Sequence, residues 1–225
     1  MFHVKQLIKF CFLYFGLNAS GQSIILFKDV PLPRPEANNE VVLKWNKNQP
    51  GLNELSAIEQ QFYYWVNYSR KYPSQFFDSI VTPLANIYSQ LKGSNYKSLE
   101  ADLKNAGSIS LLDLNSVLSQ MAAYQAKDIT TNNASPSHTS TNGETFVDRF
   151  KQFGFKNCGG ENISYGASNA TPIFMLVMLY LDINVPDLGH RKALLNPNYT
   201  STGISVYAYK NGNIFLVEDF ACAQN

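Results

Sequence analysis

Apolar residues recur at helical spacing through the first half of the chain. The first apolar stripe predicts a helix that ends before Pro73, since side chains return to the same helix face every three or four residues. The residues of this stripe are Leu55, Ile58, Phe62, Trp65 and Val66. Ser56 and Glu59 match a capping box at the start of this helix, although Asn53 is an equally good cap.

The segments that follow predict further helices and then a loop. Two short helices are expected around 76–77 and 84–91, and a longer one is expected over 94–106. With Asp113 as its cap, the next helix keeps a 3.6-residue apolar period for more than four turns, which is the clearest pattern in the chain. Small polar residues over 131–143 predict a loop.

The second half of the chain adds strands. A short helix is expected over 144–154, and a strand over 155–165, in which Gly159–Gly160 marks a bulge or a close backbone approach. Thr171–Pro172 predicts the start of an apolar, buried helix. The segment 203–220 contains two strand-like runs around a Lys-Asn-Gly turn, which predicts a hairpin. This order of elements predicts an α/β domain with helices on both faces of a small mixed sheet.

The N-terminal residues predict a secretory signal rather than part of the domain. Two lysines precede a short apolar run over 10–17, and small residues follow it. The run is shorter than the roughly 20 apolar residues that a membrane-spanning helix needs. We therefore expect a cleaved signal peptide over 1–21, an extended arm over 22–52 with a candidate short strand at 41–45, and one globular domain over 53–225.

Composition and charge narrow the partners and the compartment. The chain has 225 residues and a formal net charge of +1, and it has no basic cluster long enough to follow a nucleic-acid backbone. After signal cleavage no transmembrane segment is expected, and the protein would be secreted, extracellular or periplasmic. Cys158 and Cys222 would then remain and would pair in an oxidising compartment, with two buried free thiols as the alternative.

Two imidazoles and two carboxylates carry the candidate chemistry. His138 lies in the polar loop, Glu161 follows a pair of glycines, Asp182 ends the apolar helix, and His190 lies in a Gly-His-Arg turn. Glu161 lies in an apolar segment and needs a partner, because burying an unpaired charge costs several kcal/mol. That partner is a histidine, a metal or an arginine. Each histidine also has a non-functional interpretation. His138 would be a solvated loop side chain, and His190 would hydrogen-bond the backbone at the start of a helix.

A set of motifs resembles a known family. The motifs are Ser137-His138, Gly160-Glu161-Asn162-Ile163, Tyr165-Gly166, Gly189-His190-Arg191, Leu195-Asn196-Pro197 and Gly203-Ile204. Their spacing is similar to that of the CAP superfamily (the SCP domain of cysteine-rich secretory, antigen 5 and pathogenesis-related proteins), in the compact form common in bacteria. The likeness extends from near residue 55 to about residue 220. It implies a three-layer α-β-α sandwich with a cleft that holds two histidines and two acids.

The resemblance also implies a ligand set for that cleft. The histidines would be His138 and His190, and the first acid would be Glu161. Asp182 matches the second acid, although the family's tryptophan three residues before it is missing, and Asp187 is a possible substitute. Such a set would bind a divalent metal, with Zn²⁺ as the expected ion, because two imidazoles and a carboxylate leave a fourth position for water.

Three functions are compatible with this resemblance. The first is a secreted binding module for a lipid or sterol, or for an extracellular protein. The second is a metal-assisted hydrolase such as a peptidase, although the motifs His-Glu-x-x-His and Gly-x-Ser-x-Gly are both absent. The third is a stable scaffold in which the four residues only hold loops together. The sequence assigns no catalytic residue among these alternatives.

Overall fold

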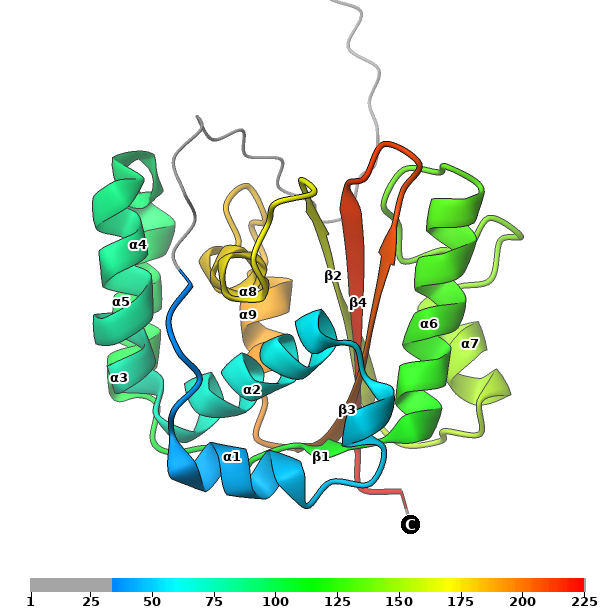
Figure 1. The fold of residues 1–225 in the computed structure, drawn as a ribbon, viewed down its shortest axis with the longest axis horizontal. Coiled ribbons are helices and arrows are strands. Elements are labelled where there is room, and N and C mark those ends of the chain that lie inside the picture. The colour runs from blue at the N-terminus through cyan, green and yellow to red at the C-terminus, as the bar shows by residue number, and fades with distance from the viewer. Residues whose placement is uncertain (1–33, 225) are drawn as a thin grey trace, which may run out of the picture.

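The computed structural model describes residues 34–224, which form the expected three-layer α-β-α sandwich (Figure 1). Its helices are α1 (Glu40–Lys47), α2 (Ala57–Lys71), α3 (Pro73–Phe76), α4 (Thr82–Ile87), α5 (Ser94–Asn105), α6 (Ser116–Thr131), α7 (Phe146–Gln152), α8 (Pro172–Leu181) and α9 (Gly189–Leu194). Its strands are β1 (Asp113–Leu114), β2 (Gly159–Gly166), β3 (Tyr199–Ala208) and β4 (Ile214–Cys222). A π-helical segment, Phe77–Val81, joins α3 to α4, and 3₁₀ turns lie at Leu52–Glu54 and Ser89–Leu91.

The four strands form one mixed sheet in the order β1-β3-β4-β2. β1 is parallel to β3, while β3 and β4 form the expected antiparallel hairpin and β2 pairs antiparallel with β4. Within residues 34–224, β2 therefore lies at an edge of this sheet, next to β4. This strand carries Glu161, so the register between β2 and β4 decides what surrounds that carboxylate.

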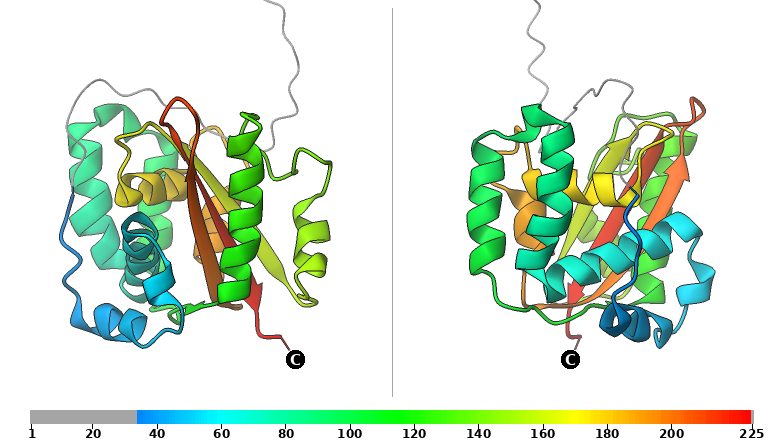
Figure 2. Two further views of the ribbon diagram at one scale, coloured as in Figure 1. Left: turned by 45° about the vertical axis from the view of Figure 1, so that its right-hand side comes forward. Right: turned by 60° about the vertical axis from the view of Figure 1, so that its left-hand side comes forward.

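Helices cover both faces of the sheet (Figure 2). α6 packs on β3 and β4 from one side with α7 beside it, and α2, α8 and α9 contact β2 or β3 from the other side. The alternation along β4 follows this arrangement: Phe215 and Val217 pack with α6 residues, whereas Leu216 and Phe220 belong to the core shared with α2 and α8. β4 is buried from Phe215 to Ala221 because it has a helix layer on each face.

Three glycines let elements approach one another closely. A Cβ atom on Gly203 would lie 2.1 Å from the backbone nitrogen of Ser119, so the backbone of α6 rests directly on β3. Gly159 and Gly160 are covered by the side chains of Phe150 and Tyr199, at 2.5 Å from an added Cβ in both cases. The β2–β4 register is continuous through both positions, so the close approach is confirmed and the bulge is not.

The N-terminal arm differs from its prediction. Val41 to Trp45 lie in α1, a helix capped by Asn39, and do not form a short strand. Val42 is fully buried in the main core, and the indole of Trp45 donates a hydrogen bond to the carbonyl oxygen of Leu112 at 3.0 Å. Tertiary packing of a short amphipathic segment therefore decides its conformation here. The expected signal peptide and the start of the arm lie outside the described residues.

Helix starts show where local signals were sufficient. Ser56 and Glu59 form the capping box of α2, as expected. The cap of α6 is Asn115 and not Asp113, because the amide oxygen of Asn115 accepts from two backbone N–H groups while Asp113 pairs with β3 as part of β1. α7 begins at Phe146, two residues later than predicted, and Thr145 caps it.

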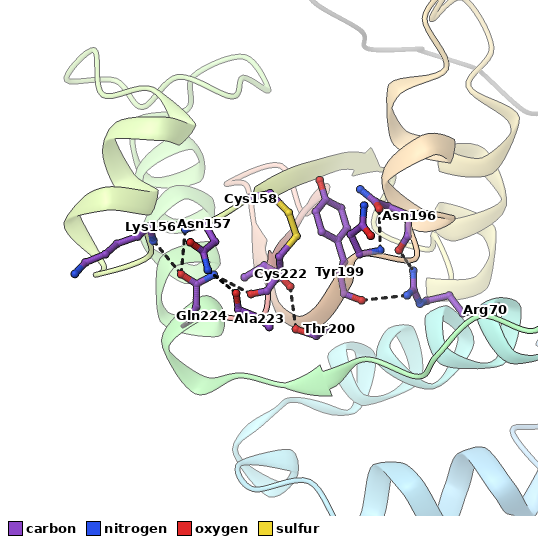
Figure 3. The surroundings of a disulfide bond; sticks show 12 residues. Arg70, Lys156, Asn157, Cys158, Asn196, Tyr199, Thr200, Cys222, Ala223 and Gln224 are labelled. Atoms are coloured by element: carbon purple, nitrogen blue, oxygen red, sulfur yellow. Dashed lines mark hydrogen bonds between the residues drawn. A yellow bond between two sulfur atoms is a disulfide. The ribbon is translucent and has the colours of Figure 1, made fainter.

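The expected disulfide joins Cys158 to Cys222, the residue before β2 and the last residue of β4 (Figure 3). The C-terminal tail adds hydrogen bonds at the same place, since the Gln224 side chain accepts from the backbone nitrogens of Lys156 at 2.9 Å and Asn157 at 3.2 Å. These links fix the entry of β2, three residues before Glu161. Within residues 34–224, no helix is long and apolar enough to cross a membrane.

Candidate functional site

The first candidate pair is His138 with Glu161. The Nδ1 atom of His138 lies 2.8 Å from Oε1 of Glu161. The Glu161 side chain is 1% exposed and the His138 side chain is 31% exposed, so the acid is buried beneath a partly open imidazole. Glu161 faces Asp219 across the β2–β4 ladder, which places it on the α6 side of the sheet, next to the loop that carries His138.

Arg149 completes this pair from α7. One guanidinium nitrogen donates to Oε2 of Glu161 at 2.5 Å. The other donates to the carbonyl oxygen of His138 at 3.0 Å and to the hydroxyl of Ser140 at 3.1 Å. The buried carboxylate thus has a histidine and an arginine as partners at once, although the sequence presented them as alternatives.

The second candidate pair is His190 with Asp182. The Nδ1 atom of His190 lies 2.5 Å from Oδ1 of Asp182, and Oδ2 accepts from the backbone N–H of Arg191 at 2.9 Å. Asp182 is the residue after α8 and has left-handed backbone torsions (φ 49°), which are uncommon for an aspartate. Asp187 is exposed, so the acid that contacts His190 is Asp182 and not its alternative.

The side chain of Arg191 connects the elements around the second pair. Its guanidinium donates to the carbonyl oxygen of Tyr180 at 2.7 Å, to that of Asn95 at 3.1 Å and to the carboxylate of Asp102 at 2.9 Å. The side chain is 2% exposed. It therefore ties α9 to α8 and to α5.

That the four residues bind a metal ion together stays a prediction. Within residues 34–224 no three His, Cys, Asp or Glu side chains are placed so that they could hold a metal ion together. Glu161 and Asp182 are each already occupied by a histidine and by an N–H donor. The acids act here as partners that orient the imidazoles.

Two further buried acids lie on β4, of which Asp219 faces Glu161, and the sequence analysis missed them. Glu218 and Asp219 are adjacent on β4 and fully buried, and burial raises the pKa of Glu218 to about 8. Burial and the neighbouring Glu161 raise the pKa of Asp219 well above its usual range, with Arg149 acting in the opposite direction. Among the described residues, both Asp219 oxygens and Oε2 of Glu218 lack a hydrogen-bond partner. Two charged residues within an apolar strand were the signal available in the sequence.

A hollow on the surface lies elsewhere. Its volume is about 370 Å³, and its lining residues are Lys71, Tyr72, Pro73, Ser74, Gln75, Ala106 and Ser108. This places it where α2 meets α3. None of the four candidate residues lines it, so it is not a cleft that the two histidines share.

Solved structures resemble this chain at low sequence identity. An extracellular protein containing an SCP domain, from Bacillus anthracis, is 21% identical with a TM-score of 0.46, and the match covers 74% of this chain and 40% of that one. An outer surface protein from Borrelia burgdorferi is 17% identical with a TM-score of 0.44, covering 66% and 96%. A cysteine-rich secretory protein from Staphylococcus aureus is 14% identical with a TM-score of 0.36, covering 64% and 39%. This chain thus spans well under half of the Bacillus and Staphylococcus proteins.

The family assignment rests on the sequence itself. No curated protein matches the chain significantly. The model of the cysteine-rich secretory protein family, CAP, matches residues 66–220, which is more than half of the chain and includes both histidine–acid pairs. The three-layer fold and the mixed sheet agree with what the sequence motifs implied. This chain therefore belongs to the CAP family of cysteine-rich secretory proteins.

Proposed function

We propose that this chain is an extracellular binding module whose ligand contacts the Nε2 atoms of His138 and His190. The observation that carries the proposal is common to both residues: Nδ1 of each imidazole contacts a buried carboxylate. The predicted signal peptide supports an extracellular location, and the disulfide is typical of an oxidising compartment.

The carboxylates determine which ring atom is available. An ionised carboxylate can only accept a hydrogen bond, so the neutral imidazole carries its proton on Nδ1. Nε2 then has a free lone pair and can accept a proton, bind a cation or accept a hydrogen bond from a ligand. The His138 side chain is 31% exposed and the His190 side chain is 10% exposed, so His138 is the more accessible contact.

We propose an extracellular protein as the ligand, in preference to a lipid or sterol. The segment 131–143 around His138 consists mainly of small polar residues, many of them exposed. Such a loop offers hydrogen-bonding groups to a polar partner and no apolar groove for an acyl chain or a sterol. Binding to phosphatidylcholine vesicles with and without cholesterol would argue for the lipid alternative.

A divalent metal is the simplest probe of this site. Zn²⁺ would meet imidazole nitrogens of His138 and His190, and its remaining ligands would be water or groups of the bound partner. When bound, the ion would supply a Lewis-acidic bridge between the histidines and the ligand. Within residues 34–224 no three His, Cys, Asp or Glu side chains are placed to hold the ion together, so the proposal uses Zn²⁺ as a probe.

Calorimetric titration of the purified protein with Zn²⁺ at neutral pH tests the proposal. We expect stoichiometric binding that is lost in His138→Ala and in His190→Ala and kept in Asp187→Asn, which changes an exposed acid beside the same turn. No binding, with both alanine variants merely less stable than the wild type, would instead make the four residues structural. The chain would then be a scaffold.

A hydrolase is the second candidate function, and one observation favours it. His190 is oriented by Asp182, which is itself fixed by a backbone N–H, and this arrangement suits a histidine that acts as a general base toward a water molecule. A panel of peptide and ester substrates tests it. We expect His190→Asn to abolish hydrolysis with its circular dichroism spectrum unchanged. Hydrolysis at wild-type rate in that variant would refute the assignment.

A further inference from the structure

We propose that Arg149 is the positioning residue of His138. The orientation of His138 therefore depends on a single side chain, whereas that of His190 does not. The inference deepens the proposed function and depends on it for its biological meaning. Its structural basis is independent, because it concerns how the two imidazoles are held in the unliganded protein.

Arg149 closes a ring of hydrogen bonds around His138. Its guanidinium binds the carbonyl oxygen of His138 at 3.0 Å and Oε2 of Glu161 at 2.5 Å, while Oε1 of Glu161 lies 2.8 Å from the imidazole. One side chain therefore fixes both ends of the histidine, its backbone and its ring. His138 lies in a segment without helix or strand, so no regular element supplies this restraint.

The ring depends on the geometry of a guanidinium. Arg149 donates through both terminal nitrogens, with the carbonyl oxygen of Glu144 and the hydroxyl of Ser140 as further acceptors. A lysine carries the same charge on a single nitrogen and cannot reach acceptors on two sides in the same fixed plane. Arg149 is fully buried, so water cannot take the place of a lost contact at low cost.

His190 is held by a different kind of donor. Its acid, Asp182, accepts from the main-chain N–H of Arg191, and the Arg191 side chain binds other groups. A side-chain substitution at Arg191 therefore weakens packing but leaves the donor to Asp182 in the chain. The two histidines are alike in contacting a carboxylate and differ in what fixes that carboxylate.

This difference provides a matched pair of variants, Arg149→Lys and Arg191→Lys. Both replace a buried arginine with a buried lysine. The readout is the ¹⁵N spectrum of the imidazoles, which separates the Nδ1–H from the Nε2–H tautomer and shows whether the Nδ1 proton is protected from exchange. In the wild type we expect both histidines to be Nδ1–H tautomers with protected protons.

The expected result is a selective loss. Arg149→Lys should lose the protected Nδ1–H signal of His138 and keep that of His190, whereas Arg191→Lys should keep both signals. Unchanged His138 signals in folded Arg149→Lys would overturn the proposal. If that variant does not fold, Ser140→Ala provides the test, because it removes one acceptor of Arg149. Ser140→Ala should weaken the protection of the Nδ1 proton of His138 and leave that of His190 unchanged. Unchanged protection at His138 would overturn the proposal.

The same samples separate this inference from the proposed function. The tautomers are measured without any ligand, and zinc binding is then measured by titration of the same protein. Selective loss at His138 together with no zinc binding by the wild type would support the positioning by Arg149 and count against the proposed function. Zinc binding by the wild type with unaltered tautomers in Arg149→Lys would support the function and refute the positioning.

Discussion

Buried arginines donate hydrogen bonds to several main-chain carbonyl groups where loops meet the core. Besides Arg149 and Arg191, Arg70 is fully buried, and it donates to the carbonyl oxygens of Leu194 at 2.8 Å and Asn196 at 3.0 Å. Guanidinium groups suit this task because they carry five N–H donors in a rigid plane. They connect segments that have few regular hydrogen bonds of their own, and Figure 3 shows Arg70 in this position near the start of β3.

Glu218 makes the stability of the protein depend on pH. Its folded pKa, about 8, lies above the usual value of 4.5, because burial disfavours the charged form. The folded state then binds more protons than the unfolded state, so the free energy of unfolding falls as pH rises from about 4.5 to about 8. We expect Glu218→Gln to match the wild type near pH 4 and to exceed it by about 4 kcal/mol above pH 8.

Urea denaturation of both proteins at pH 4.5, 6.5 and 8.5 checks this prediction. Glu54→Gln serves as the control, because it makes the same substitution at an exposed position. A difference between wild type and Glu218→Gln that is the same at all three pH values would show that Glu218 is ionised throughout.

At the scale of elements, the contact between α6 and β3 is the tightest feature. The backbone of Leu118 and Ser119 lies where the side chain of residue 203 would be, at 2.1–2.2 Å from an added Cβ. Backbone atoms of a long helix cannot move aside cheaply. We expect Gly203→Ala to lower the free energy of unfolding by about 3 kcal/mol, at the upper end of what overpacking costs.

Chemical denaturation measures this loss against Gly107→Ala, a matched control. An added Cβ on Gly107 has no neighbour within 4 Å, so that variant should lie within about 0.5 kcal/mol of the wild type. Equal stabilities for the two variants would mean that α6 shifts on the sheet without cost.

Long elements could be predicted from the sequence, and short ones could not. The apolar stripes of α2, α5 and α6 and the alternation in β3 and β4 extend over several periods, and each is confirmed as an element. β1 consists of Asp113–Leu114 alone and exists only because β3 offers it a partner. The helix α1 was not predicted for a related reason, since it depends on Val42 and Trp45 reaching the core. Tertiary contacts decided these segments, and local periodicity could not show them.

The candidate site could be predicted at the level of residue types but not of geometry. The demand of a buried Glu161 for a partner was correctly inferred, and the structure supplies both His138 and Arg149. The sequence could not show that Glu161 and Asp182 would each be occupied by one histidine and by an N–H donor, since this depends on tertiary contacts. That the four residues bind one metal ion stays a prediction, and no three such side chains are placed to hold one within residues 34–224.

At the scale of the whole molecule, the disulfide closes most of the C-terminal third of the chain. It links residues 64 positions apart, and the closed segment contains Glu161, Asp182 and His190. In the chain-entropy model, closing a loop of this length stabilises the fold by about 4 kcal/mol. We expect the double variant Cys158→Ser/Cys222→Ser to lose that amount in urea denaturation.

Wild-type protein kept in a thiol reductant is the internal comparison for this prediction. It should unfold at the same urea concentration as the double variant, because both lack the crosslink and keep every other contact. A double variant as stable as the oxidised wild type would show that the hydrogen bonds of the C-terminal tail suffice to hold β2 against β4.

The way each histidine is anchored has a consequence for genetic robustness. A main-chain N–H donor survives every replacement except proline. Asp182 therefore keeps its main-chain donor, and His190 its orientation, whichever residue other than proline codon 191 specifies. The anchor of Glu161 exists only while codon 149 specifies arginine. In a library of random point variants, defects confined to the His138 half should therefore arise from changes at more codons than defects confined to the His190 half.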